Sequence, residues 1–220
     1  QAGFEFERMR KRILRHLNQR SEMLSGISHD LRTPLTRIKL QLALIKDEKI
    51  SRKLSEDVEE MEKMLNEYLQ FTSSTSSEKN ELFDISKLLN HSIMKYENKN
   101  IASTIEQKIF FNGRKNLINR CIDNLINNSL KYSNKVLVNL KKIHKSLIIT
   151  VDDDGPGIAE SEYENVFKPF YKINKGRGDS KSSVGLGLSI SSDVVRSHGG
   201  SITLDKSSLG GLRVKISLPF

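Results

Sequence analysis

Apolar residues recur at alternating intervals of three and four positions through the first third of the chain, a pattern typical of helices that pack along a seam. Two heptad series run three residues apart, and their members are Leu14, Ser21, Ser28, Leu35 and Leu42 in one and Leu17, Leu24, Leu31, Ile38 and Ile45 in the other. A second seam follows the polar segment KDEKIS and comprises Leu54, Val58, Met61, Leu65, Tyr68 and Thr72. So short a connection predicts antiparallel helices. Because one hairpin cannot bury both seams, we expect a homodimeric four-helix bundle through residues 8–72.

The polar, serine-rich stretch TSSTSSEKN ends this pattern and is the best domain boundary in the chain. The elements expected beyond it are a short strand ending near residue 111, helices at 114–132 and 185–199, and hairpins at 135–153 and 200–218. This order predicts helices on one side of a mostly antiparallel sheet, a two-layer α/β sandwich. The expected divisions are a helical extension of an upstream region at residues 1–20, a dimerisation domain at 21–74, a linker at 75–80 and the α/β domain at 81–220.

Composition and charge narrow the function classes. The chain has 220 residues, a formal net charge of +9 and one cysteine, which excludes a disulfide framework and favours a reducing compartment. No stretch approaches the length of a membrane span and no signal-peptide pattern is present, although a chain that begins at Gln1 is expected to continue from a longer protein. The positive charge lies in RMRKRILRHLNQR and KPFYKINKGRGDSK, without the patterns of nucleic-acid binders, so we expect no nucleic-acid partner.

The stretch SGISHDLRTPLTRIKL places His29 beside Asp30 on the first helix. Neutral imidazole is a competent nucleophile near neutral pH, and a neighbouring carboxylate can orient the ring and accept its proton. The alternative for His29 is an ordinary solvated histidine. Pro34 follows in the same helix and has no N–H to donate to the carbonyl of Asp30, which predicts either a tolerated kink or a hinge beneath the histidine.

The acidic glycine motif DDDGPGIA follows directly on the apolar run SLIITV. A carboxylate at the end of a strand, followed by Gly155 and Gly157, stands at a sharp turn that a flat ligand can approach closely. By itself this motif is more typical of an acidic hairpin turn, so its weight depends on the motifs that accompany it.

The helix expected at 114–132 carries Asn124, Asn128 and Lys131 on a face separate from its apolar side. Amide oxygens can ligate Mg²⁺ beside nucleotide phosphates, whereas the alternative is a polar surface stripe. Asparagine is a mediocre helix former, so three asparagines within five helical positions need a reason.

The stretch SSVGLGLSI places Gly185 and Gly187 at a loop-to-helix junction, where backbone N–H groups suit a phosphate. Before it lies a basic loop that Phe167, Pro169 and Phe170 anchor. We expect this loop to be able to close over a nucleotide.

In this order the motifs resemble those of the bacterial sensor histidine kinases over nearly the whole chain. SHDLRTPLTRI is similar to the H box, the helix with Asn124 and Asn128 to the N box, DDGPGI to the G1 box, FKPF to the F box and GLGL to the G2 box. The H box, VDDDGPGIA and the turn at Gly210 and Gly211 are most similar to the osmosensor kinases of the EnvZ type. One departure is Ser183, where the family usually has the first glycine of the G2 box.

The resemblance implies a dimerisation and histidine-phosphotransfer domain followed by an ATP-binding domain of the GHKL, or Bergerat, fold. It implies that His29 accepts the phosphoryl group, with Asp30 and Thr33 as catalytic neighbours. It also implies that Asp153 accepts a hydrogen bond from the adenine amino group and that Asn128 ligates Mg²⁺. The implied nucleotide site comprises Asn124, Asn128, Lys131, Tyr132, Asp153, Gly155, Gly157, Ile158, Phe170, Gly185, Leu186, Gly187 and Leu188.

The function implied by the resemblance is ATP-dependent autophosphorylation of His29 and transfer to an aspartate of a response-regulator receiver domain. The chain would then be the cytoplasmic portion of an inner-membrane sensor, with membrane segments only upstream. Thr33 stands where relatives with H-D-x-x-T position a water, which implies phosphatase activity as well. Asn124 stands where related ATPases carry a glutamate that activates water, which favours a kinase over a free-standing ATPase. The other alternative is a degenerate scaffold that docks a receiver without turnover.

Overall fold

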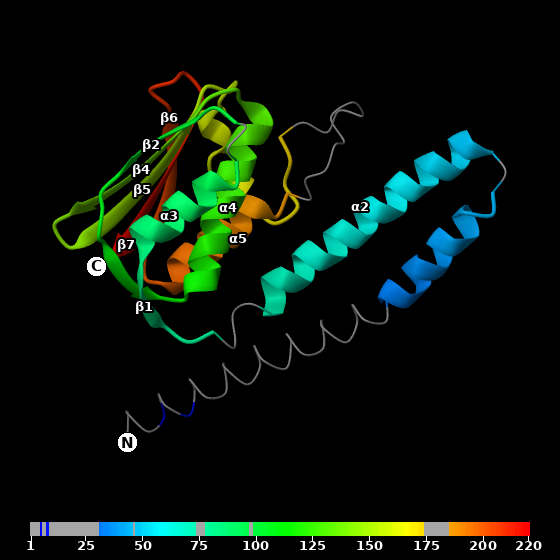
Figure 1. The fold of residues 1–220 in the computed structure, drawn as a ribbon, viewed down its shortest axis with the longest axis horizontal. Coiled ribbons are helices and arrows are strands. Elements are labelled where there is room, and N and C mark those ends of the chain that lie inside the picture. The colour runs from blue at the N-terminus through cyan, green and yellow to red at the C-terminus, as the bar shows by residue number, and fades with distance from the viewer. Residues whose placement is uncertain are drawn as a thin grey trace. The chain divides into compact units, whose positions relative to one another are not determined.

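The computed structural model describes residues 5, 8, 31–45, 47–73, 78–96, 99–173 and 185–220. The chain divides into two units, Gln1–Glu78 and Lys79–Phe220, and each is described by itself (Figure 1). His29, Asp30 and Ser183 lie outside the described residues. In the described part of the chain, no helix combines the length and apolarity needed to cross a bilayer.

The first unit contains a helical hairpin (Figure 1). One helix runs over residues 31–42 and continues through Pro34, and α2 (Glu48–Ser73) follows after a short turn. Asp47 caps α2, because its Oδ1 accepts a hydrogen bond from the backbone N–H of Lys49 at 3.0 Å. A short polar connection therefore ends one helix and starts the next, as the sequence pattern predicts.

Two contacts tie the helices of this hairpin together. The Ser51 hydroxyl donates to the carbonyl of Leu42 at 2.7 Å, close to the turn. Further along, the Lys39 ammonium forms an ion pair with Glu62 at 2.7 Å. The partner of the earlier residue, Lys39, lies later in α2 than the partner of Leu42, so the helices are antiparallel.

The two heptad series differ in burial within the single chain. Leu35 and Leu42 of the first series are buried together with Val58 of α2, and Leu65 packs against them. Members of the second series, and two apolar residues of α2, remain between 39% and 54% exposed. These exposed residues, which we call the apolar stripes, are Leu31 and Ile38 on the first helix, Ile45 just after its end, and Leu54 and Met61 on α2.

The second unit is a sheet with helices on one face (Figure 1). Among the described residues its five strands are, in spatial order, β2 (Ile101–Ile105), β4 (Val136–Ile143), β5 (Ser146–Asp153), β7 (Leu212–Pro219) and β6 (Ser201–Lys206). β2 runs parallel to β4, and the other neighbouring pairs of this sheet are antiparallel. The helices are α3 (Ile85–Met94), α4 (Lys115–Tyr132) and α5 (Gly187–Ser197). The predicted fold class, a helical segment followed by a two-layer α/β sandwich, is confirmed.

Several short elements were not predicted from the apolar pattern. β2 is one of them, and three of its five residues are exposed, so it lacks the alternation that marks a half-buried strand. Asp84 caps the unpredicted α3 by accepting a hydrogen bond from the backbone N–H of Lys87 at 3.1 Å. The others are β1 (Glu81–Asp84), which pairs with β3 (Phe110–Gly113) as a separate antiparallel ribbon, and two 3₁₀ turns at Glu160–Glu162 and Asn165–Phe167.

The core of the second unit lies between the sheet and α4. Residues at alternate positions of the three inner strands point toward the helices and are at most 2% exposed: Val138, Leu140, Ile149, Val151, Val214 and Ile216. The matching apolar side of α4 consists of Leu117, Ile118, Cys121, Ile122, Leu125 and Ile126. This packing fixes the end of the inner strand β5 beside the end of α4, where the sequence places its candidate site residues.

The thiol of Cys121 lies in this core, 1% exposed, with its Sγ 3.8 Å from the carbonyl oxygen of Ser191 on α5. Burial raises the pKa of the thiol from 9.0 to about 12. We therefore expect Cys121 to resist alkylation by iodoacetamide at about pH 8.5 in the folded chain and to react only in urea, as measured by mass spectrometry. Because the unfolded thiol ionises at lower pH than the folded one, the free energy of unfolding should fall as pH rises between these two values. Rapid alkylation of the native chain would contradict this placement.

Candidate functional site

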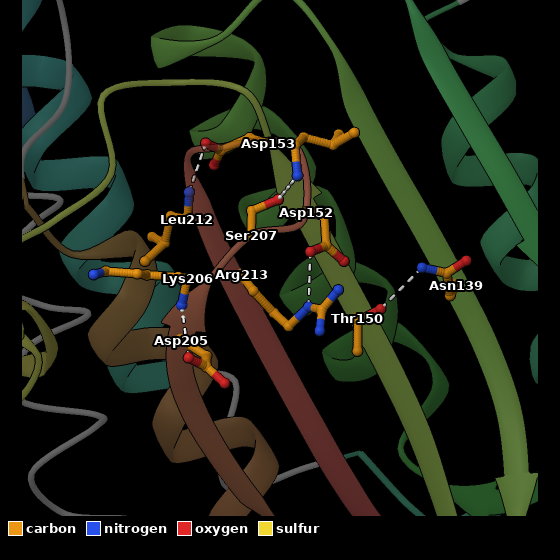
Figure 2. A network of polar contacts seen from close by, with 10 residues as sticks. Asn139, Thr150, Asp152, Asp153, Asp205, Lys206, Ser207, Leu212 and Arg213 are labelled. Carbon is orange, nitrogen blue, oxygen red and sulfur yellow. Dashed lines mark hydrogen bonds and ion pairs between the residues drawn. The ribbon is translucent and has the colours of Figure 1, made fainter.

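The end of β5 carries the carboxylate of Asp153, which is 5% exposed. Its Oδ1 accepts hydrogen bonds from the backbone N–H groups of Gly155 and Leu212, each at 3.0 Å, and Figure 2 shows the second of these. Among the described residues, none donates a hydrogen bond to Oδ2. A carboxylate with one oxygen held by the backbone and the other available suits recognition of an amino group on a ligand.

The turn after Asp153 depends on glycine. A Cβ at Gly155 would lie 2.7 Å from the carbonyl oxygen of Tyr132, so the turn approaches the end of α4 more closely than any side chain allows. Gly157 has a φ of +69°, in the left-handed region that favours glycine, and Ile158 after it is half-buried. The G1 motif and the end of the N-box helix are therefore in direct backbone contact.

Asp154 ties the same turn to the loop that follows α4. Its Oδ1 accepts hydrogen bonds from the backbone N–H groups of Asn134 and Lys135, both at 2.8 Å. The bond from Lys135 is the main reason that the pKa of this carboxyl lies below its ordinary value. No role of Asp154 was predicted from the sequence, where its only signal is a third carboxylate before the glycine turn.

Within α4, Asn124 and Asn128 are half-buried, whereas Lys131 and Tyr132 are exposed. The Nδ2 atom of Asn124 is buried and has no hydrogen-bond partner in the described part of the chain. A buried donor without a partner costs about 1–3 kcal/mol, and an anionic oxygen of a bound ligand would remove that cost. This orphaned donor fits a nucleotide phosphate, and amide oxygens on the same helix are ligands that Mg²⁺ accepts.

Two other polar residues of α4, Asp123 and Asn127, make contacts within the protein. The side chain of Asn127 is hydrogen-bonded to Tyr96, the pKa of which is raised mainly by burial. Asp123 forms an ion pair with Lys95 at 2.8 Å and accepts a hydrogen bond from Asn119 at 3.2 Å. These contacts join α4 to the end of α3, which explains one of the three asparagines structurally and leaves Asn124 and Asn128 as candidates for ligand binding.

The F-box and G2 segments meet through the backbone. The N–H of Phe170 donates to the carbonyl of Gly185 at 3.0 Å, and Gly185 has a φ of +78°. α5 begins at Gly187, where an added Cβ would meet no described atom within 4 Å. The first N–H groups of a helix have no intrahelical partner, so this helix start suits a phosphate. The other two predicted residues of this segment are Leu186, which is buried, and Leu188, which is half-buried.

Because α4 and α5 pack against each other, the candidate residues of α4 and the F-box and G2 segments at the start of α5 belong to neighbouring helices of the second unit (Figure 1). On the first unit, Thr33 is exposed and Pro34 is half-buried within the helix over residues 31–42. The side-chain geometry of His29 and Asp30 falls outside the described residues, so their roles stay predictions.

An ion pair with a buried carboxylate and a partly exposed guanidinium stands on the opposite face of β5 from Asp153 (Figure 2). Asp152 is fully buried, and its Oδ1 accepts from Nε of Arg213 on β7 at 2.7 Å. We expect Arg213→Met to lower the free energy of unfolding by about 2–3 kcal/mol in urea titrations, because it leaves a buried carboxylate unpaired. The double variant Asp152→Leu with Arg213→Met should recover most of this loss, and equal stability of the wild type and Arg213→Met would contradict the expectation.

Comparison with known proteins agrees with this arrangement. Residues 19–77 match the family model of the His Kinase A (phospho-acceptor) domain, and residues 113–220 match that of the histidine kinase-, DNA gyrase B- and HSP90-like ATPase. The chain is 36% identical to the sensor histidine kinase GtrS of Pseudomonas aeruginosa, over 97% of this chain and 45% of that protein. It is 31% identical to the sensor histidine kinase CpxA of Escherichia coli, over 99% of this chain and 51% of that protein. The chain thus spans about half the length of the curated relatives it matches.

Solved structures show the same fold. The crystal structure of full-length ShkA in complex with AMPPNP matches 91% of this chain and 46% of its own, with a TM-score of 0.72 at 20% identity. The mycobacterial sensor histidine kinase MprB matches 64% of this chain and 97% of its own, with a TM-score of 0.56 at 26% identity. The fold and the two family matches define a helical hairpin of the phospho-acceptor type followed by an ATPase-type domain.

The chain belongs to the sensor histidine kinases and comprises the catalytic core of that family. The predicted family is thereby confirmed. The named relatives include GtrS, CpxA and RstB, and the comparisons do not specifically support the likeness to osmosensor kinases of the EnvZ type.

Proposed function

We propose that this chain uses ATP to phosphorylate its own His29 and then transfers the phosphoryl group to an aspartate of a response-regulator receiver domain. The observation that carries the proposal is the carboxylate of Asp153, held through Oδ1 and open at Oδ2, beside a helix with an unpartnered buried amide on Asn124. These two features suit an adenine amino group and a phosphate oxygen, the two ends of an adenine nucleotide.

The chemical step that we propose is an in-line displacement. One ring nitrogen of neutral His29 attacks the γ-phosphorus of ATP, the bond from phosphorus to the bridging oxygen breaks, and ADP leaves. The proton of the other ring nitrogen passes to Asp30, which also orients the ring. Mg²⁺, when bound, neutralises charge on the phosphates, and the amide oxygen of Asn128 is the ligand that α4 would supply.

The residues of α4 favour a kinase over a free-standing ATPase. The amide of Asn124 cannot accept a proton from water, so no general base for hydrolysis stands at this position. We therefore propose that bound ATP is spared until His29 is presented. The degenerate scaffold remains the second candidate, because Ser183 departs from the G2 box of the family.

The apolar stripes support a homodimer. Leu31, Ile38 and Ile45 repeat every seven residues along the first helix and the turn after it, and they stay exposed in the single chain. Fully burying an apolar side chain of this size contributes about 1.5–3 kcal/mol, and a second copy of the hairpin presents stripes of the same spacing. We propose that two hairpins pair through these stripes into a four-helix bundle.

Labelling with γ-labelled ATP and Mg²⁺ tests the proposed function. We expect the full chain to acquire acid-labile, base-stable label and to pass it to an added receiver domain. Nucleotide binding without label on the chain would favour the scaffold, and steady release of phosphate without a labelled intermediate would favour an ATPase. Either result overturns the kinase proposal.

We also propose that the chain dephosphorylates the receiver and that it is the cytoplasmic portion of an inner-membrane sensor. Thr33 supports phosphatase activity, because it is exposed on the helix over residues 31–42, lies four residues after His29 in the sequence, and can orient a water. The proposed location, on the cytoplasmic side of the inner membrane, rests on the family alone.

Pro34 offers a test of how the two activities are balanced. We expect Pro34→Ala to stiffen the helix and to lower the ratio of autophosphorylation rate to phosphatase rate about fivefold, equivalent to about 1 kcal/mol of coupling. Rates with labelled ATP and with phosphorylated receiver measure the two activities, and Thr36→Ala on the same helix is the matched control. An unchanged ratio in Pro34→Ala would show a tolerated kink and no hinge.

A further inference from the structure

The turn between β6 and β7 holds Asp153 from the far end of the sequence. Leu212 donates its backbone N–H to Oδ1 of Asp153, and Gly211 donates its own to the backbone carbonyl of Asp153, both at 3.0 Å. Figure 2 shows this turn against the end of β5, with Ser207 and Leu212 beside Asp153. A segment nearly 60 residues away in sequence therefore fixes both the backbone and the carboxylate of the predicted base-recognition residue.

Hydrogen bonds within the turn give it its shape. The N–H of Ser207 donates to the carbonyl of Gly211 at 2.9 Å, and the N–H of Gly210 donates back to the carbonyl of Ser207 at 3.1 Å. The hydroxyl of Ser207 accepts from the N–H of Leu209 at 3.0 Å. These bonds involve no ligand, so the donors that face Asp153 are oriented before a nucleotide arrives.

The two glycines of the turn differ in what surrounds them. A Cβ at Gly211 would collide with Oδ1 of Asp153 and would lie 2.5 Å from the backbone nitrogen of Gly155 and 2.6 Å from the carbonyl oxygen of Asp153. Gly210 has a φ of +106°, but a Cβ there would meet no described atom within 4 Å. A side chain at Gly210 therefore strains only the turn, whereas one at Gly211 displaces Asp153.

We propose that Gly211, together with the backbone N–H of Leu212, is a positioning element for base recognition. It locks Oδ1 of Asp153, so that Oδ2 alone faces the ligand as an acceptor for the 6-amino group of a purine. A carboxylate that is already locked loses no rotamer freedom on binding, which strengthens discrimination between amino and oxo purines. This inference rests on the proposed binding of ATP by the second unit.

Titration of the full chain with ADP and with inosine diphosphate, which carries an oxo group in place of the 6-amino group, tests the proposal. We expect the wild type to bind ADP at least about tenfold more tightly than inosine diphosphate, and Gly211→Ala to lose about tenfold in ADP affinity and most of this preference. Gly210→Ala is the matched control, and it should lower the unfolding temperature while keeping the wild-type preference. A preference retained by Gly211→Ala would overturn the proposal.

Amide exchange keeps the proposal testable if Gly211→Ala does not fold. In the nucleotide-free wild type, the amides of Gly155 and Leu212 should be protected, and Asp153→Ala should remove the protection of both. Protection that arises only after ADP is added would show that the lock forms on binding, which overturns the proposal. Failure of the wild type to bind ADP would instead refute the proposed function, and the positioning role of Gly211 would fall with it.

Discussion

His29→Gln is expected to abolish incorporation of label from γ-labelled ATP, with a loss of at least about a thousandfold in rate. The lone pair of a glutamine amide nitrogen is delocalised into the carbonyl, so glutamine cannot attack phosphorus as imidazole does. ADP affinity should remain within about twofold of the wild type, because the predicted nucleotide residues belong to the second unit. Autoradiography after denaturing electrophoresis measures the label, and calorimetric titration measures the affinity.

The matched control is His91→Gln, which replaces an exposed histidine at the end of α3 and should label normally. Mixing His29→Gln chains with Asp153→Asn chains adds a test of the dimer. Recovery of label would show transfer between the two copies, and the absence of recovery would indicate transfer within one copy. Undiminished labelling of His29→Gln would show that another residue is the phosphoacceptor.

Asp153→Asn is expected to weaken ADP binding by about 10- to 100-fold, the range for losing a hydrogen bond to a charged group. The amide oxygen of asparagine can still accept from Gly155 and Leu212, so the turn should keep its shape. Its NH₂ group would then face the ligand in place of Oδ2. A donor there opposes the adenine amino group and matches an oxo group, so inosine diphosphate should lose less affinity than ADP or gain some.

Titrations of both nucleotides into the wild type, Asp153→Asn and Asp205→Asn measure this effect. Asp205 is an exposed carboxylate on β6 and serves as the control, with both affinities unchanged. Equal losses for the two nucleotides would mean that Asp153 supports the site without contacting the base. Unchanged ADP affinity would remove Asp153 from the site altogether.

Much of the candidate site could be predicted from local sequence. The turn at Gly155 and Gly157 was expected because glycine permits left-handed backbone and close approach, and the structure shows both at these positions. The roles of the site residues in binding and catalysis stay predictions. Asp154 and Arg213 were missed, because their partners lie 19 to 61 residues away and no local pattern records such pairs.

The fold shows the same division. The helical hairpin, α4 and the two hairpins of strands were predictable, since each repeats apolar residues with its own period over many positions. The short edge strand β2 and the strand β1 that pairs with β3 were not, because four or five residues with little burial carry no clear period.

By itself, then, the sequence determined the class of each long element, the family and the order of its motifs, because these depend on spacing along the chain. Only the tertiary structure decided which heptad series the hairpin buries, with Leu35 and Leu42 covered and Leu31 and Ile38 exposed. It also decided that the backbone of a distant turn, through Leu212, holds the carboxylate of Asp153. Both outcomes arise from contacts between segments far apart in sequence, and periodicity within one segment does not specify its partner.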